Sequence, residues 1–316
     1  MILTNVRPTL VDISPFFLPV PQHHDLDESF VQACHQTRRD LPYELTNALS
    51  QFAAGDSSGA LLLRGLPVGV VPSTPATPSA PTAKDRTSEC TLLTLATLLG
   101  EPVGYAPEHG GKIVQNIVPV QATAAKQVST SSNVTLDFHT ETAFHPEKPH
   151  YLLLLCLRGD PNAATLLCSV ASALSLLDAE TISVLRQPRF RTRPDVSFLS
   201  GPDTLGEFGP AAPILAGTVE QPTFTFDADL MIGLDDAAEQ AIEALRKAVQ
   251  AAHSGVVLEA GDLLVIDNHA AVHGRSPFAA RYDGTDRWVQ RAFVVDAIPE
   301  GSGRVITTTF PEVPRG

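Results

Sequence analysis

The stretch from Leu136 to Glu141 constrains the fold of this chain more than any other part of the sequence. In an extended strand successive side chains alternate between the two faces, so His139 and Glu141 project to one side and Thr140 to the other. Two residue types that bind metals therefore share a face. A second histidine from far along the chain would complete a two-histidine, one-carboxylate set, which suits non-heme Fe(II) with open positions. The fold must then bring that histidine beside this strand.

His273 is the candidate for this second histidine. It follows the strand-like run 261–268 and stands directly before Gly274-Arg275-Ser276-Pro277-Phe278. His269 is the alternative, but it lacks that following context. A His-x-Glu tripeptide alone occurs often by chance, so the combination with His273 is what favours a metal site over ordinary packing. We assign His145 to a structural role and expect Arg275 to brace the loop after His273.

Composition indicates a globular protein without a membrane anchor. The 316 residues are 43% hydrophobic and 18% charged, and we expect one domain over residues 1–316. The longest apolar run, Leu152–Leu157, is too short to span a bilayer, and Met1–Arg7 does not resemble a signal peptide. We therefore expect a cytoplasmic protein. The net charge of -13 argues against nucleic acid or an anionic membrane as a partner.

Periodicity predicts many short strands with a few helices, an arrangement typical of a jelly roll flanked by helices. Helical spacing covers residues 27–53, divided by Pro42, and residues 91–99, 171–184 and 235–252. Strand patterns cover residues 59–66, 112–120, 129–139, 151–157, 222–227, 255–266 and 287–295. Residues 67–85 are expected to form a flexible loop. The segment 200–221, rich in Gly and Pro, is expected to be an active-site lid.

Five blocks of the chain resemble the Fe(II)/2-oxoglutarate-dependent oxygenases, in the branch that contains clavaminate synthase and the free amino-acid hydroxylases acting on arginine and asparagine. The blocks are residues 136–145, 156–158, 226–231, 272–278 and 287–293. This resemblance implies a double-stranded β-helix, mainly β with flanking helices. It also implies Fe(II) held by His139, Glu141 and His273, with 2-oxoglutarate as co-substrate and O2 as oxidant.

The same resemblance implies roles for further residues. The distal carboxylate of 2-oxoglutarate would pair with Arg287, whose planar guanidinium suits a carboxylate, and Thr165 would help to hold it. Arg291 would project to the same side as Arg287 and bind the substrate α-carboxylate. The other implied substrate contacts are Gln115 and Ser129 at the amino-acid backbone, and Asp227 and Asp229 at the polar end of the side chain.

These residues predict hydroxylation of an unactivated carbon of a free L-amino acid, a small-molecule substrate with a basic or amide-bearing side chain, with release of succinate and CO2. Glu141 fills the position that is small in the halogenases of the family, so halogenation is not expected. Desaturation, cyclisation and a carrier-bound substrate stay open. A cupin-like metal-binding protein without turnover is the alternative of another class, and Arg287 argues against it. A zinc hydrolase is disfavoured because no H-E-x-x-H helix is present.

Overall fold

Two facing β-sheets form the centre of the computed structural model, which describes residues 7–21, 25–55, 58–201 and 204–314. The major sheet has the strand order β1 (Thr9–Asp12), β2 (Ala60–Arg64), β14 (Leu263–Asp267), β6 (Tyr151–Arg158), β16 (Trp288–Val295), β3 (Glu101–Tyr105), β17 (Val305–Ile306), and β4 (Gln115–Ile117) also pairs with β16. The minor sheet has the order β13 (Ser254–Val257), β7 (Ala164–Ser169), β15 (Ala271–Arg275), β5 (Leu136–His139).

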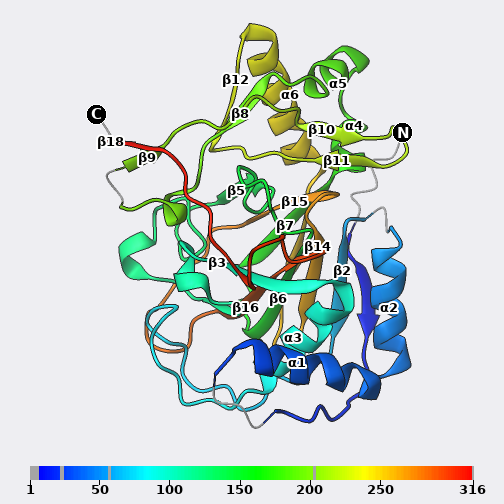
Figure 1. Cartoon of the computed structure of the whole chain (residues 1–316), viewed down its shortest axis with the longest axis vertical. Helices are drawn as coiled ribbons and strands as arrows, with labels where there is room; N and C mark the ends of the chain where they lie inside the picture. The colour runs from blue at the N-terminus through cyan, green and yellow to red at the C-terminus, as the bar shows by residue number, and fades with distance from the viewer. Residues whose placement is uncertain (1–6, 22–24, 56–57, 202–203, 315–316) are drawn as a thin grey trace.

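Helices cover the outer faces of both sheets (Figure 1). The first group is α1 (Glu28–Thr37), α2 (Tyr43–Ala53) and α3 (Thr87–Leu99), and the second is α4 (Val170–Leu174), α5 (Ala179–Leu185) and α6 (Asp236–Ala252). Three small ribbons pair β8 (Phe190–Thr192) with β12 (Met231–Gly233), β10 (Leu215–Gly217) with β11 (Pro222–Phe224), and β9 (Thr204–Gly206) with β18 (Glu312–Pro314). Short 3-10 turns are η1 (Arg38–Asp40), η2 (His109–Gly111), η3 (Gln121–Thr123) and η4 (Val196–Phe198).

The central strand β6 shows why the molecule has these layers. It is apolar along almost its whole length, and its side chains alternate between two cores. Leu153 and Leu155 belong to the core shared with α1, α2 and α3. Leu152 and Leu154 belong to the core between the two sheets. A strand that is buried on both faces reads as a continuous hydrophobic run, as this one does.

The outer face of the minor sheet packs against α6. Phe138 of β5 and Val272 of β15 share a core with Ile242 and Leu245 of α6. The side chain of Asp235 accepts a hydrogen bond from the Ala238 backbone N–H and caps the start of this helix. Each group of helices packs on one of two sheets that share a core. We therefore propose that the chain forms a single domain.

The predicted jelly roll is confirmed, with corrections to several elements. Pro42 does separate two helices, since α1 and η1 end before it and α2 begins after it. The single helix predicted over 171–184 is wrong, because the chain forms α4 and α5, and Asp178 caps the second of them. The strands predicted over 112–120 and 129–139 are shorter than expected, at β4 and β5. The run 255–266 is two strands, β13 and β14.

The two segments predicted as loops differ in secondary structure. Residues 67–85 contain no helix or strand, but Arg158 donates to Pro72 O at 2.9 Å, and Thr74 in this loop is buried. The segment 200–221 carries β9 and β10, although residues 202 and 203 lie outside the described part. Its mobility and that of 67–85 stay predictions. Within the described ranges no helix has the length and apolar character needed to cross a membrane.

Candidate metal and co-substrate site

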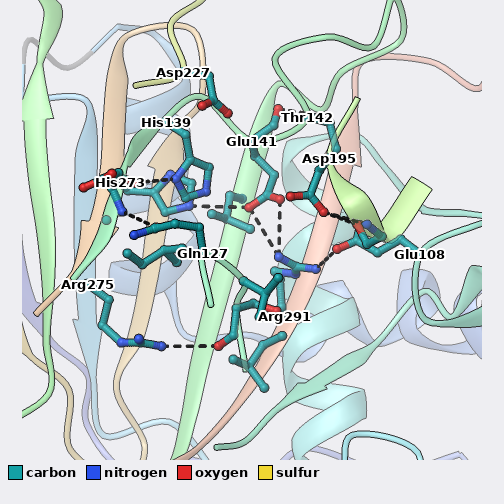
Figure 2. Close-up of a pocket in the computed structure, with 18 of the residues that line it drawn as sticks. Glu108, Gln127, His139, Glu141, Thr142, Asp195, Asp227, His273, Arg275 and Arg291 are labelled. Carbon is teal, nitrogen blue, oxygen red and sulfur yellow. Dashed lines mark hydrogen bonds and ion pairs between the residues drawn. The ribbon is translucent and has the colours of Figure 1, made fainter. Parts of the chain in front are cut away.

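His139, Glu141 and His273 meet between the two sheets. One ligand atom from each lies within 4.8 Å of the others, and His273 Nε2 is 3.4 Å from Glu141 Oε2. Strand pairing brings them together, because His139 on β5 and His273 on β15 are direct partners in the antiparallel register. The side chains converge in Figure 2. His269, the alternative histidine, does not join them and lies against His150 instead.

Hydrogen bonds between side chains and backbone position His139 and Glu141. His139 Nδ1 lies 2.8 Å from Asp137 O, which places the ring proton on Nδ1 and leaves Nε2 as the ligand atom. Strand β5 ends at His139, so strand alternation alone does not position Glu141. Asn268 holds it instead, with Oδ1 accepting from Glu141 N at 2.8 Å and Nδ2 donating to Glu141 O at 3.1 Å.

The charge states at this cluster suit a divalent metal ion. Burial raises the pKa of Glu141, but the Arg291 guanidinium, His273 and His139 outweigh that effect and lower it, so the carboxylate is ionised. Burial lowers the pKa of His273 to about 4, which keeps that imidazole neutral near pH 7. Two imidazoles and one carboxylate form the donor set that non-heme Fe(II) accepts.

Arg287 brings a buried positive charge into the same cavity. It precedes β16, its side chain is 7% exposed, and it lines the cavity with Thr165 of β7. Among the described residues it forms no hydrogen bond and no ion pair, and burial lowers its pKa. An unpaired buried cation is costly unless an anion accompanies it. The cavity therefore fits a ligand with a carboxylate at this position.

Arg275 differs from Arg287 although both line the cavity. Its guanidinium donates to Ser131 Oγ at 2.9 Å and to Ser129 O at 3.3 Å, and it lies 5.2 Å from the centre of the Phe278 ring. The contacts to Ser129 and Ser131 brace the segment before β5, whereas the prediction placed the bracing at the loop after His273. Ser129 itself lines the cavity, and its contact with substrate stays a prediction.

Arg291 lies on β16, and its guanidinium contacts two carboxylates and one amide. Its Nη1 is 3.3 Å from Glu141 Oε1, its Nη2 contacts Glu108, and its Nε donates to Gln115 Oε1 at 3.0 Å. Figure 2 shows the guanidinium between the two carboxylates. Gln115 lies behind Arg291 and is absent from the cavity lining. In this structure Gln115 Oε1 accepts hydrogen bonds from Arg291, and its contact with substrate stays a prediction.

Asp227 and Asp229 line the opposite part of the cavity, near His139. The Asp227 carboxylate is buried, and its Oδ1 accepts from Asp229 N at 2.9 Å and Leu230 N at 2.8 Å. It therefore closes a turn, as aspartates commonly do, while its second oxygen is free of these bonds. Burial raises the pKa of Asp227. Asp229 is exposed at the cavity edge.

Sequence reasoning missed several residues of the lining. His109 begins η2 and Glu108 precedes it, and Asp195, Ser197 and Phe198 come from η4 and the residue before it. Gly110 and Gly111 follow His109 and have positive φ values of 67° and 75°, so the Gly-Gly pair was a local sequence signal of a special turn. The segment 195–198 lies over the cavity, immediately before the predicted lid.

The jelly roll and this arrangement of ligands define a class: a mononuclear non-heme iron oxygenase with a carboxylate-bearing co-substrate. Comparisons with known proteins agree. Residues 215–293 match the family model described as taurine catabolism dioxygenase TauD, TfdA family. The chain is 38% identical to L-lysine 3-hydroxylase of Catenulispora acidiphila, over 86% of this chain and 78% of that protein. It is 37% identical to L-asparagine oxygenase of Streptomyces coelicolor, over 85% and 81%.

Solved structures show the same likeness. Asparagine oxygenase in complex with Fe(II), 2S,3S-3-hydroxyasparagine and succinate superposes with a TM-score of 0.83, at 34% identity and over 90% of this chain and 91% of that one. The non-heme iron oxygenase OrfP with Fe, succinate and (3S)-hydroxy-L-Arg has a TM-score of 0.81, at 31% identity and over 90% and 92%. The chain belongs to the clavaminate synthase-like branch of the Fe(II)/2-oxoglutarate-dependent oxygenases.

Replacing Asn268 with alanine tests how the carboxylate is held. The change leaves the N–H and C=O of Glu141 and the Pro149 C=O without their side-chain partner. Each buried polar group left unpaired costs about 1–3 kcal/mol. We expect a lower free energy of unfolding in urea and weaker Fe(II) binding. The exposed Asn133→Ala is the control and should change neither. Unchanged Fe(II) affinity in Asn268→Ala would refute the positioning role.

Proposed function

We propose that this chain hydroxylates an unactivated carbon of a free basic L-amino acid, with Fe(II) and 2-oxoglutarate. The single observation that carries the proposal is Arg287. It is a buried cation with no hydrogen-bond or ion-pair partner among the described residues, and it lines the cavity that also holds His139, Glu141 and His273. A protein that only bound a metal would have no use for this second charge. A dicarboxylate whose other end reaches the metal accounts for both features.

His139, Glu141 and His273 would hold the iron, and Arg287 with Thr165 would hold the distal carboxylate of 2-oxoglutarate. Iron and co-substrate supply the oxidant when bound: 2-oxoglutarate and O2 give succinate and CO2, and one oxygen atom becomes the new hydroxyl group. The chain orients the target carbon toward the metal and excludes water. Leu152, Leu154 and Val289 form the apolar wall of the cavity that serves this exclusion.

Arg291 and Glu108 favour the zwitterionic end of an amino acid. Arg291 lines the cavity and would bind the α-carboxylate, as the sequence predicted. Glu108 lies beside it, and its Oε2 is buried and has no hydrogen-bond partner among the residues described. An α-ammonium group would satisfy that oxygen. Gln115 would hold Arg291 in place, and Ser129 would contact the substrate from the segment before β5.

The other end of the cavity favours a cationic side chain. Asp137, Asp227 and Asp229 line it and provide three carboxyl groups. A guanidinium or ammonium group would neutralise the buried Asp227 and form charge-assisted hydrogen bonds. Named relatives support this choice, because they include an L-lysine 3-hydroxylase and an L-ornithine/L-arginine 3-hydroxylase. Another relative is clavaminate synthase 2, and desaturation or cyclisation stays the alternative reaction at this site.

Anaerobic loading with Fe(II) followed by O2 tests the reaction. With 2-oxoglutarate and lysine, ornithine or arginine, we expect one succinate per hydroxylated amino acid, measured by mass spectrometry. His139→Ala should abolish both products, since a metal ligand is lost. His35→Ala, at an exposed helix position, should retain both. No turnover with any common free amino acid would contradict the proposal and favour a carrier-bound substrate.

Replacing Arg287 with alanine tests the co-substrate role. A hydrogen bond to a charged group contributes about 1.5–3 kcal/mol. We therefore expect the KM for 2-oxoglutarate to rise by about 10- to 150-fold. Arg281→Ala is the matched control, because Arg281 is exposed and its guanidinium donates to Thr285, away from the cavity. An unchanged KM in Arg287→Ala would overturn the assignment.

Replacing Asp227 with asparagine tests the choice of side chain. The amide keeps an acceptor for the Asp229 and Leu230 N–H groups, so the turn is preserved. We expect kcat/KM for lysine, ornithine and arginine to fall tenfold or more, and kcat/KM for neutral amino acids to change little. Asp236→Asn, on the exposed first turn of α6, is the control. Equal losses for cationic and neutral substrates would show that Asp227 acts only on the fold.

A further inference from the structure

A second cluster of metal-binding residue types lies apart from the active cavity. His150, Asp267 and His269 each offer one ligand atom within 4.8 Å of the other two. His150 directly precedes β6, Asp267 ends β14, and His269 lies in the turn between β14 and β15. None of the three lines the cavity that holds His139 and His273.

The two nitrogens of the His150 ring contact two different carboxylates. Nδ1 is 2.6 Å from Asp296 Oδ1, and Nε2 is 3.7 Å from Asp267 Oδ1. A metal-binding histidine almost always donates its other ring N–H to a carboxylate or carbonyl group, which sets the tautomer and orients the ring. Asp296 provides that partner, so Nε2 is the ligand atom and points toward Asp267.

Stacking holds the two histidines side by side. The ring centres of His150 and His269 are 4.5 Å apart, and the rings are 25° from parallel. The Tyr151 ring also stacks on His150, with 4.1 Å between the ring centres. No hydrogen bond to the His269 ring is found among the described residues. Burial lowers the pKa of His269, together with the nearby His150 and Lys148, so the imidazole is neutral near pH 7 and available as a ligand.

The charge and exposure of this cluster suit a divalent ion. Two carboxylates, those of Asp267 and Asp296, lie near the cluster, together with the ammonium group of Lys148. His150, Asp267 and His269 are partly exposed, which gives an entry path for an ion and for a water ligand. Two imidazoles, one carboxylate and an open fourth position form the set typical of tetrahedral zinc, whose ligand distances are about 2.0–2.2 Å.

We propose that His150, Asp267 and His269 form a second metal site, which takes Zn²⁺ or a similar divalent transition ion, with Asp296 orienting His150. The site is connected to the active cavity through Asn268, which stands between two of its ligands. Asn268 N donates to His150 O at 2.8 Å, and its side chain holds the backbone of Glu141. An ion here would stiffen the turn that positions Glu141.

Counting bound Zn²⁺ tests the proposal on the full chain. After removal of metals and titration by calorimetry, we expect two ions per wild-type chain, one in each cluster. His269→Ala should bind one ion and keep the active-site triad, and His139→Ala should bind one ion at the second site. The double variant should bind none, and His35→Ala should bind two. Circular dichroism of each variant checks that it is folded.

The outcomes separate the second site from the proposed function. One ion in wild type, lost in His269→Ala and kept in His139→Ala, would support the second site and contradict the triad. Two ions in His269→Ala, or one ion in wild type that only His139→Ala removes, would overturn the second site. If His269→Ala does not fold, His150→Gln gives the same comparison.

Asp296→Asn tests the orienting carboxylate. Loss of an outer partner typically weakens metal affinity 10- to 100-fold, so we expect that loss for the second ion only. A second readout is the melting temperature, which Zn²⁺ should raise in His139→Ala but not in the double variant, because an ion that binds only the folded state stabilises it. Equal affinity in Asp296→Asn would refute its orienting role.

Discussion

The antiparallel pairing of β5 with β15 is the interaction on which the site depends. It makes His139 and His273 direct partners, although 134 residues separate them in the sequence. β15 also pairs with β7, which brings Thr165 opposite Arg275 at the other end of the same strand. A shift of one residue in this register would turn the histidine toward the apolar core. The layers of leucine and phenylalanine on both sides oppose such a shift.

The cavity concentrates charge in a place where burial is costly. Glu108, Glu141 and Arg291 compensate one another, whereas Arg287 and the second oxygen of Asp227 have no such partner in the part of the chain that the structure describes. Such groups lower stability unless an opposite charge accompanies them. Ligands that bring the opposite charge recover this free energy, so binding of co-substrate and substrate is coupled to stability. The same buried charges that are costly without a partner therefore favour ligands of opposite charge.

Much of this site was predictable from residue types and their order. His139, Glu141, His273 and Arg287 carry recognisable chemistry in recognisable contexts, and strand alternation correctly places Arg287 and Arg291 on one face of the sheet. Trp288 points to the opposite face and lies in the core with the N-terminal helices, as alternation predicts. The break between α4 and α5 was missed, because the apolar spacing continues through it.

The sequence by itself determined the metal-binding residue types and the two-sided burial of the central strands, because both follow from local chemistry and from the period of a strand. Only the tertiary structure decided which partners those residues have. Gln115 stands behind Arg291, Asn268 holds Glu141, and His269 joins His150 instead of the active-site histidines. Each of these contacts joins segments far apart in the chain, and no local pattern specifies them. They depend on strand order and register, which packing of the whole core selects.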